Sequence, residues 1–304
     1  MAGFLIFGKQ RRIMKKIIRK SVALLVAALG VVFLAAGRIQ AVDTYFNGFE
    51  VDTDGWLSNG GTITRVASGT NSITSADGDW HAEALIGDDF DGVFTRWGGY
   101  ESAFPANGYV TELDIYLDMA LNTVVGTDLR FDYSSAINDP TGTHRRDFIF
   151  SVGTDPTTTG QFVMSASNNA PGWPANPGRD PFVIDTTGWY TFRHTFQDNG
   201  AGVLAVVMEV LDSSGTVLHS WTLSDPSDVI GTTVGGNRYG WFVTSDFSFL
   251  AVDNSEKNNL AGPVLTKAEL LMDSGITGKG LETAPGLMKP FNPNSKAADN
   301  AGKK

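Results

Sequence analysis

Short stretches of alternating apolar and polar residues, separated by glycine, asparagine, aspartate and proline, fill the chain from residue 42 to residue 253. In residues 109–118 the apolar side chains alternate with acidic ones, with one offset near Thr111. No amphipathic helical pattern of ten or more residues interrupts the series. The pattern predicts an all-β domain, a two-sheet antiparallel jelly-roll β-sandwich. Further strands are expected at 148–152, 161–165, 189–196, 203–211, 217–223, 239–243 and 249–253.

Turn sequences support this prediction. Asp212-Ser-Ser-Gly215 separates two expected strands, and its glycine suits the positive φ of a tight hairpin. Residues 52–56 and 185–189 are near copies, Asp-Thr-Asp-Gly-Trp and Asp-Thr-Thr-Gly-Trp. In both, Asp and Thr side chains can close a turn before a strand that starts with tryptophan. Two similar hairpin entries explain the likeness, and a duplicated domain is the alternative.

The first 41 residues have the order of a secretory signal peptide. Basic residues are concentrated in 9–20, an apolar stretch covers 21–37, and Ala41 is a plausible residue before the cleavage point. The predicted N-terminal signal helix places the rest of the chain outside the cytoplasm, secreted or periplasmic. The alternative is an uncleaved signal segment, which would be the one contact with a membrane.

Charge divides the rest of the chain in two. Residues 42–253 hold 28 acidic residues, eight arginines and no lysine, whereas residues 254–304 hold seven lysines and five acids. The prediction is therefore a β-sandwich domain at 42–253 and a flexible, largely disordered lysine-bearing tail at 254–304. Because the acidic domain repels phosphates, nucleic acid is not an expected partner. The chain contains no cysteine, so its core must stabilise it without disulfides.

Two sets of segments carry a resemblance to known families. Residues 46–50 with Asp54-Gly55-Trp56, and residues 249–253, resemble the first and last strands of carbohydrate-binding jelly-roll modules. Residues 188–196, 203–211 and 215–221 are similar to consecutive strands of concanavalin A-like and laminin-G-like sandwiches. The resemblance implies a sandwich fold that handles carbohydrate. In many such modules an acid of the first strand and an aspartate of the last share a structural Ca²⁺, which would correspond to Glu50, Asp52 and Asp253 here.

Two further groups are candidate ligand-binding residues. Trp173 lies between two prolines in a loop that also holds Arg179, where it either stacks on a sugar ring or folds back over the core. Tyr133 and the run His144, Arg145 and Arg146 form the other group, the one place where positive charge gathers. Arginine pairs hold carboxylates well. These arginines either bind an anionic ligand or pair internally with Asp132, Asp139 or Asp147.

Glycoside hydrolysis is less well supported. Glucanases of the resembled family carry Glu-x-Asp-x-Glu, and Glu112-x-Asp114 begins that pattern, but residue 116 is tyrosine. The next acid, Asp118, lies about 20 Å from Glu112 along a strand, whereas a retaining pair needs about 5 Å. No catalytic residue is therefore assigned. The sequence favours an exported, non-catalytic sandwich that binds a polysaccharide or cell-surface glycan. The alternatives are a structural or interaction protein of the envelope or matrix and a divergent glycoside hydrolase or lyase.

Overall fold

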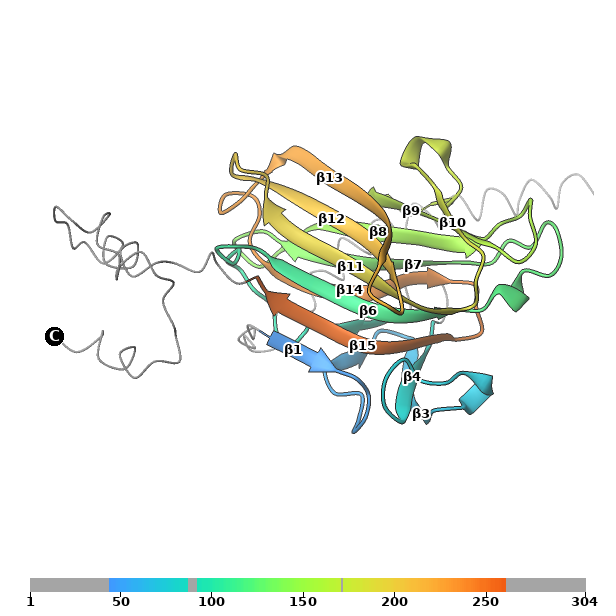
Figure 1. Cartoon of the computed structure of the whole chain (residues 1–304). Helices are drawn as coiled ribbons and strands as arrows, with labels where there is room; N and C mark the ends of the chain where they lie inside the picture. The colour runs from blue at the N-terminus through green and yellow to red at the C-terminus, as the bar shows by residue number, and fades with distance from the viewer. Residues whose placement is uncertain (1–43, 87–91, 171, 261–304) are drawn as a thin grey trace, which may run out of the picture. The chain divides into compact units, whose positions relative to one another are not determined.

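The computed structural model describes residues 44–86, 92–170 and 172–260 (Figure 1). The predicted signal peptide and nearly all of the predicted tail lie outside these residues. The described part is all-β, as the alternation predicted, and no helix in it is long and apolar enough to cross a membrane. Its fifteen strands are β1 (Thr44–Asn47), β2 (Trp56–Ser58), β3 (Thr62–Ala67), β4 (Trp80–Leu85), β5 (Val93–Thr95), β6 (Tyr109–Leu117), β7 (Arg130–Asn138), β8 (His144–Thr154), β9 (Phe162–Asn168), β10 (Phe182–Ile184), β11 (Gly188–Asp198), β12 (Val203–Asp212), β13 (Val217–Val229), β14 (Asn237–Ser245) and β15 (Leu250–Asn259).

The strands form two antiparallel sheets. The eight-stranded sheet has the order β13-β12-β11-β6-β15-β4-β3, and β1 pairs with β15 at its side. The seven-stranded sheet has the order β10-β9-β8-β7-β14-β5-β2. In Figure 1 the strands from β13 to β15 cross the front of the view, and the seven-stranded sheet lies behind them. The two-layer architecture is therefore confirmed.

β6 shows how alternation builds the core between the sheets. Its side chains alternate between buried and half-buried from one end to the other, so the expected offset near Thr111 is absent. Thr111 points inward and its hydroxyl donates to Ser135 of β7, 3.2 Å away, across the sandwich. Tyr109 stacks on Phe196 with ring centroids 4.5 Å apart. A polar pair can lie among these rings because each hydroxyl has a partner.

The last strand extends beyond the predicted domain boundary at residue 253. β15 runs to Asn259, and the compact unit that contains the sandwich ends at Asn258. Asn254 has a φ of 47°, and this kink shifts the alternation by one residue. Lys257 consequently points inward, where its ammonium lies 2.7 Å from Glu101. The last strand therefore continues past the boundary that lysine content placed, and this lysine is neutralised in the sandwich rather than solvated.

Two further sequence expectations have clear outcomes. Asp212–Gly215 forms the expected hairpin between β12 and β13, with Gly215 at a φ of 80° and the Asp212 carboxylate accepting amides of the turn. The two Asp-Thr turns both precede strands, but their tryptophans differ. Trp56 lies buried in the core, whereas Trp189 lies half-exposed on the outer face of the eight-stranded sheet.

Candidate functional site

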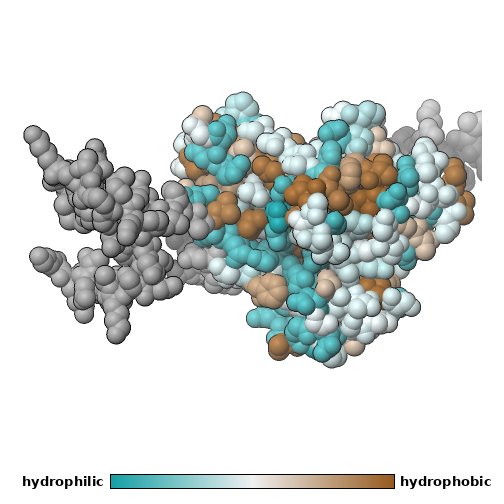
Figure 2. Space-filling view, in the orientation of Figure 1, coloured by the Kyte–Doolittle hydropathy of each residue, from teal (hydrophilic) through white to brown (hydrophobic). Residues whose placement is uncertain are grey.

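The outer face of the eight-stranded sheet carries a row of charged side chains in register. Because β6 and β11 alternate, Glu112 and Asp114 of β6 and Arg193 of β11 all lie on the side away from the core. Strand pairing places Arg193 between Glu112 and Glu209 of β12. We call Glu112, Asp114, Arg193, Glu209 and Glu256 the acidic strip. Figure 2 shows hydrophilic residues across the middle of this face.

Arg193 is held by two carboxylates of the strip. Its Nε donates to Glu112, and its Nη1 lies 3.4 Å from Glu209. Burial favours the neutral form, but the hydrogen bonds and charges of the two glutamates outweigh it and raise the pKa of Arg193. The guanidinium is therefore fixed in place and its charge is compensated by protein groups on both sides.

The carboxylates beside Arg193 are partly withdrawn from water. Asp114 accepts hydrogen bonds from the Thr191 hydroxyl at 2.5 Å and the Asn254 amide at 2.9 Å. Burial nevertheless raises the pKa of Asp114, because desolvation outweighs these bonds. Burial, together with the charge of Glu112, also raises the pKa of Glu256. The strip therefore combines fixed hydrogen-bond acceptors with an excess of negative charge.

Aromatic rings continue the face beyond the strip. Tyr116 follows Asp114 on the same side of β6, and Trp189 of β11 is its register partner. The rings meet edge to face with centroids 5.4 Å apart. The Trp189 indole N–H donates to the carbonyl of Thr74 at 2.7 Å, and His81 packs against the other side of the indole. These contacts hold Tyr116 and Trp189 in fixed orientations.

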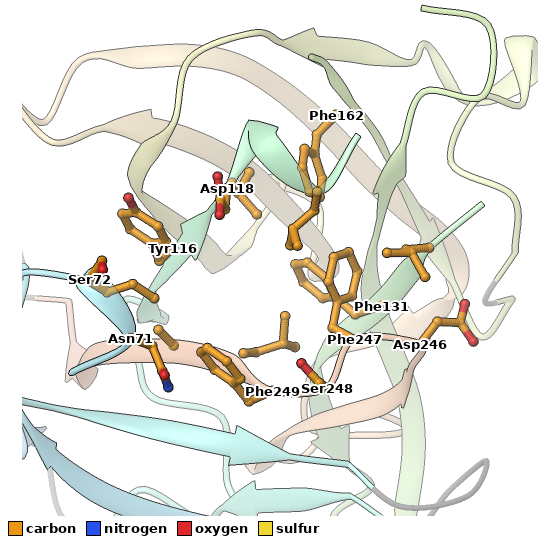
Figure 3. Close-up of a pocket in the computed structure, with 16 residues that line it drawn as sticks. Asn71, Ser72, Tyr116, Asp118, Phe131, Phe162, Asp246, Phe247, Ser248 and Phe249 are labelled. Atoms are coloured by element: carbon orange, nitrogen blue, oxygen red, sulfur yellow. The ribbon is translucent and has the colours of Figure 1, made fainter. Parts of the chain in front are cut away.

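Tyr116 also lines a pocket at the end of the sandwich (Figure 3). The pocket has a volume of about 480 Å³, within the range of small-molecule sites. Its apolar part is formed by Phe131, Phe162 and Phe247, which lie on one side of the cavity in Figure 3. Tyr116 and Asn71 lie across from them. The polar lining is completed by Ser72, Asp118, Asp246 and Ser248.

The pocket and the strip together can hold a molecule with both apolar and hydroxyl-bearing surfaces. The half-buried rings of Tyr116 and Phe249 supply apolar contact area, while carboxylates and amides supply acceptors and donors at the edges. Two of the polar groups are already oriented by the backbone. Asp118 accepts from the amide of Ala120, and Asp246 accepts from the amide of Arg130. Tyr116 connects the two areas because it lines the pocket and follows Asp114 of the strip on the same side of β6.

The arginine-rich candidate group lies elsewhere and is structural. Arg146 lies 2.6 Å from Asp228 and 3.0 Å from Asp225, and Arg145 lies 2.8 Å from Asp228. Both acids belong to β13, so the ion pairs connect the two sheets. Internal pairing was one expected outcome, but neither acid was among the partners named from the sequence, because strands 80 residues apart in the chain meet here.

Tyr133 and His144 also make contacts within the protein. Tyr133 is buried in β7, a strand that the sequence analysis missed, and it packs on Phe242, so its role as an exposed ligand contact was wrong. His144 lies 2.7 Å from Asp147. Burial opposes ionisation of Asp147, yet hydrogen bonds from His144, Ser134 and Trp241 lower its pKa. These side chains form a closed network on the seven-stranded sheet.

The proline-rich loop folds back rather than standing free. Trp173 is half-buried, and the neighbouring Pro174 packs beside Gly153 of β8. Arg179 donates to the carbonyl of Ala170 inside the loop, and its own carbonyl accepts from the Trp221 indole. The start of this loop reaches the arginine run, because the Asn169 side chain accepts from the amide of Asp147 at 2.8 Å. Sugar stacking by Trp173 stays a prediction.

The predicted calcium ligands contact backbone amides of one loop. Glu50 accepts from the amides of Asp79 and Trp80, at 3.1 and 3.0 Å. Asp253 accepts from the amide of Ala76 at 3.0 Å, and burial raises the pKa of this acid to about 7. Asp52 closes its own turn. Within residues 44–86, 92–170 and 172–260, no three His, Asp or Glu side chains group to hold a metal. Calcium binding stays a prediction, which melting with Ca²⁺ and with chelator tests.

The sequence analysis missed Arg193, Tyr116 and Trp189 as site residues. In the sequence analysis Tyr116 is the residue that interrupts an acidic motif, and Trp189 is the first residue of a strand that follows a turn. The signal that could have found them is the alternation of apolar and polar residues in both 109–117 and 188–198, taken together. It places Arg193 opposite Glu112 once the two strands are paired in register. Pairing between strands 80 residues apart cannot be obtained from one sequence.

No family model and no curated protein matches this chain. Its structure is similar to several solved β-sandwiches. A conserved carbohydrate esterase from Shiga toxin-encoding bacteriophage phi24B is 12% identical, with a TM-score of 0.41 over 73% of this chain and 99% of that one. Basic winged bean lectin is 12% identical, with a TM-score of 0.37 over 70% and 96%. Bacillus licheniformis beta-glucanase is 12% identical, with a TM-score of 0.36 over 73% and 100%.

Proposed function

We propose that this chain is an exported, non-catalytic β-sandwich that binds a carbohydrate, a polysaccharide or cell-surface glycan, at the end pocket and the adjoining acidic strip. One observation carries the proposal. Tyr116, fixed by Trp189, connects an apolar pocket of about 480 Å³ to a row of oriented acceptors on an open face. A continuous surface of this kind can receive more than one sugar unit.

The chemistry of sugars fits this arrangement. A pyranose ring presents C–H groups on its faces and hydroxyls around its edge. Aromatic rings therefore contact its faces, while carboxylates and amides accept or donate hydrogen bonds at its edge. Tyr116 and Phe249 are half-buried aromatic residues in the pocket wall, and Asn71 and Asp118 lie beside them (Figure 3). Because several of these groups are held by backbone or side-chain contacts, binding requires little reorganisation.

Titration of the protein with neutral oligosaccharides, followed by isothermal calorimetry, tests this proposal. Tyr116→Ala should weaken binding about tenfold to thirtyfold, because it removes an aromatic contact worth about 1.5–2 kcal/mol. Leu57→Ala is the control, since Leu57 is an exposed apolar residue on β2 of the seven-stranded sheet, away from the pocket and the strip. Trp173→Ala should leave binding unchanged. Equal losses in Tyr116→Ala and Leu57→Ala, or binding that depends on Trp173 alone, would contradict this location.

One observation favours a second candidate function, glycoside hydrolysis. Glu112 and Asp114 lie on the same open face, and burial raises the pKa of Asp114, as a general acid requires. Against it, Glu112 is paired with Arg193, and the next outward residue of β6 is Tyr116 rather than a carboxylate. Release of reducing ends from a polysaccharide, lost in Glu112→Gln with binding retained, would establish this second function.

A further inference from the structure

The strip and the pocket contain many more anions than cations. Four carboxylates lie on the strip, at Glu112, Asp114, Glu209 and Glu256, and two more line the pocket, at Asp118 and Asp246. In the residues that form these two areas, Arg193 is the one cationic side chain, and no lysine is present. The excess of negative charge therefore lies on the same surface that the proposed ligand covers.

The charge of Arg193 is already compensated by two carboxylates. A guanidinium binds a carboxylate or sulfate best when its N–H groups are free to form a two-point contact. Here Nε donates to Glu112 and Nη1 faces Glu209 at 3.4 Å, and both glutamates belong to neighbouring strands. An anion that approached the remaining N–H groups of Arg193 would also approach these two carboxylates.

Arg130, a cation near the pocket, lies beside one of the acids that line it. The Nε of Arg130 lies 4.0 Å from Asp246, and the backbone amide of Arg130 donates to the same carboxylate. Asp246 lines the pocket, whereas Arg130 does not. A ligand in the pocket therefore meets the acid before it meets the base.

From these contacts we infer that the site selects its glycan by charge. The site takes a chain whose sugars carry no carboxylate or sulfate groups, and it rejects polyuronates and sulfated glycans. This inference rests on the proposed carbohydrate binding and adds the class of ligand. The pocket and the aromatic residues provide the binding surface, and the acids provide the discrimination. At low salt, repulsion between the strip and an anionic chain is screened little at contact distance.

Matched pairs of polysaccharides test the inference. Laminarin, lichenan and mannan are compared with derivatives of the same chains in which the C6 hydroxymethyl groups are oxidised to carboxylates. Affinity electrophoresis and calorimetry at about 50 mM salt should show at least tenfold weaker binding of the carboxylated member. The difference should shrink at about 0.5 M salt, where screening extends over only a few ångströms. This comparison uses the unaltered chain, so no variant has to fold.

A double variant identifies the source of the discrimination. Glu112→Gln with Glu209→Gln removes two negative charges and releases the Arg193 guanidinium. The affinity for the carboxylated chains, taken as a ratio to the affinity for their neutral partners, should rise about tenfold in this variant. Asp185→Asn with Asp212→Asn is the control, because it removes two charges outside the strip and should leave the ratio unchanged. Unfolding curves establish that each variant is folded.

The outcomes separate the two proposals. A wild-type chain that binds a carboxylated member as tightly as its neutral partner, or more tightly, overturns charge selection and leaves carbohydrate binding standing. A control variant that changes the ratio as much as the strip variant overturns the role of Glu112 and Glu209. Failure of every neutral and carboxylated chain to bind overturns carbohydrate binding itself, and charge selection falls with it.

Discussion

Two groups of arginines and acids in this protein have similar composition and different surroundings. Arg146 with Asp225 and Asp228 connects β8 of one sheet to β13 of the other, and Asp228 is 1% exposed. Arg193 with Glu112 and Glu209 lies within one sheet, and each of these side chains is 20–29% exposed. Both groups hold an arginine between two acids. Only the second presents its charges on an open face.

The difference shows that the position of an ion pair determines which property of the protein it controls. Charges between two layers have lost their water, so each partner is needed to compensate the other, and removing one leaves a buried charge. Charges on an open face keep much of their hydration, so they contribute little to stability. They are, however, available to a ligand. The arginine-rich sequence around 144–147 therefore belongs to the fold, and the single Arg193 belongs to the site.

Removal of the buried acid should have the largest effect. Asp228→Asn leaves Arg145 and Arg146 without their shared carboxylate, and we expect the free energy of unfolding to fall by about 3 kcal/mol. Asp225→Asn is the matched control, because its side chain is 36% exposed and, of the two arginines, pairs with Arg146 only; it should lower stability by less than about 1 kcal/mol. Urea unfolding measures both. Similar losses in the two variants would contradict the assignment of Asp228 as the central partner.

A buried acid without an ion-pair partner should make the protein less stable as the pH rises. Asp132 is 2% exposed, and burial raises its pKa from 3.8 to about 6. The folded state favours the protonated acid, so Asp132 contributes stability below about pH 4, which is lost as the pH rises towards 6. We expect wild type to lose about 2 kcal/mol over this interval relative to Asp132→Asn. Urea unfolding from pH 4 to pH 7 measures the difference, and parallel curves would disprove it.

The sequence predicted the architecture well because alternation is local. The alternation of apolar and polar residues in 109–117 is enough to show which side of β6 faces the core, and the same holds for residues 188–198 of β11. β7 was missed because Phe131–Ile137 carries serines and an aspartate on both faces, all of them buried. A strand covered on both sides has no polar face to produce alternation. Its assignment depends on what covers it, which is tertiary information.

The candidate site was predicted less well because it depends on pairing between distant strands. Residues that are adjacent in the sequence, such as His144 to Asp147, are easily recognised as a candidate site. Arg193 has no charged neighbour in the chain and gains two acids from strands on either side. Trp189 and Trp56 follow turns of nearly the same sequence, yet Trp56 is buried and Trp189 is half-exposed. Trp56 is the first residue of β2, whereas Trp189 is the second residue of β11. Because side chains alternate between the two faces of a strand, a difference of one position can turn a side chain from the core to the outer face.

The smallest effect on stability should come from the strip itself. Glu209→Gln removes one of the two acids that hold Arg193, and because the pair is partly hydrated we expect a loss of about 0.5 kcal/mol or less. A double-mutant cycle between Arg193 and Glu209 should give a coupling energy of the same size, whereas a cycle between Arg146 and Asp228 should give a value several times larger. Urea unfolding at about 0.1 M and 0.5 M salt supplies both cycles. Equal coupling energies would show that the open face is as important for folding as the contact between the sheets, and the strip could then no longer be assigned to ligand selection alone.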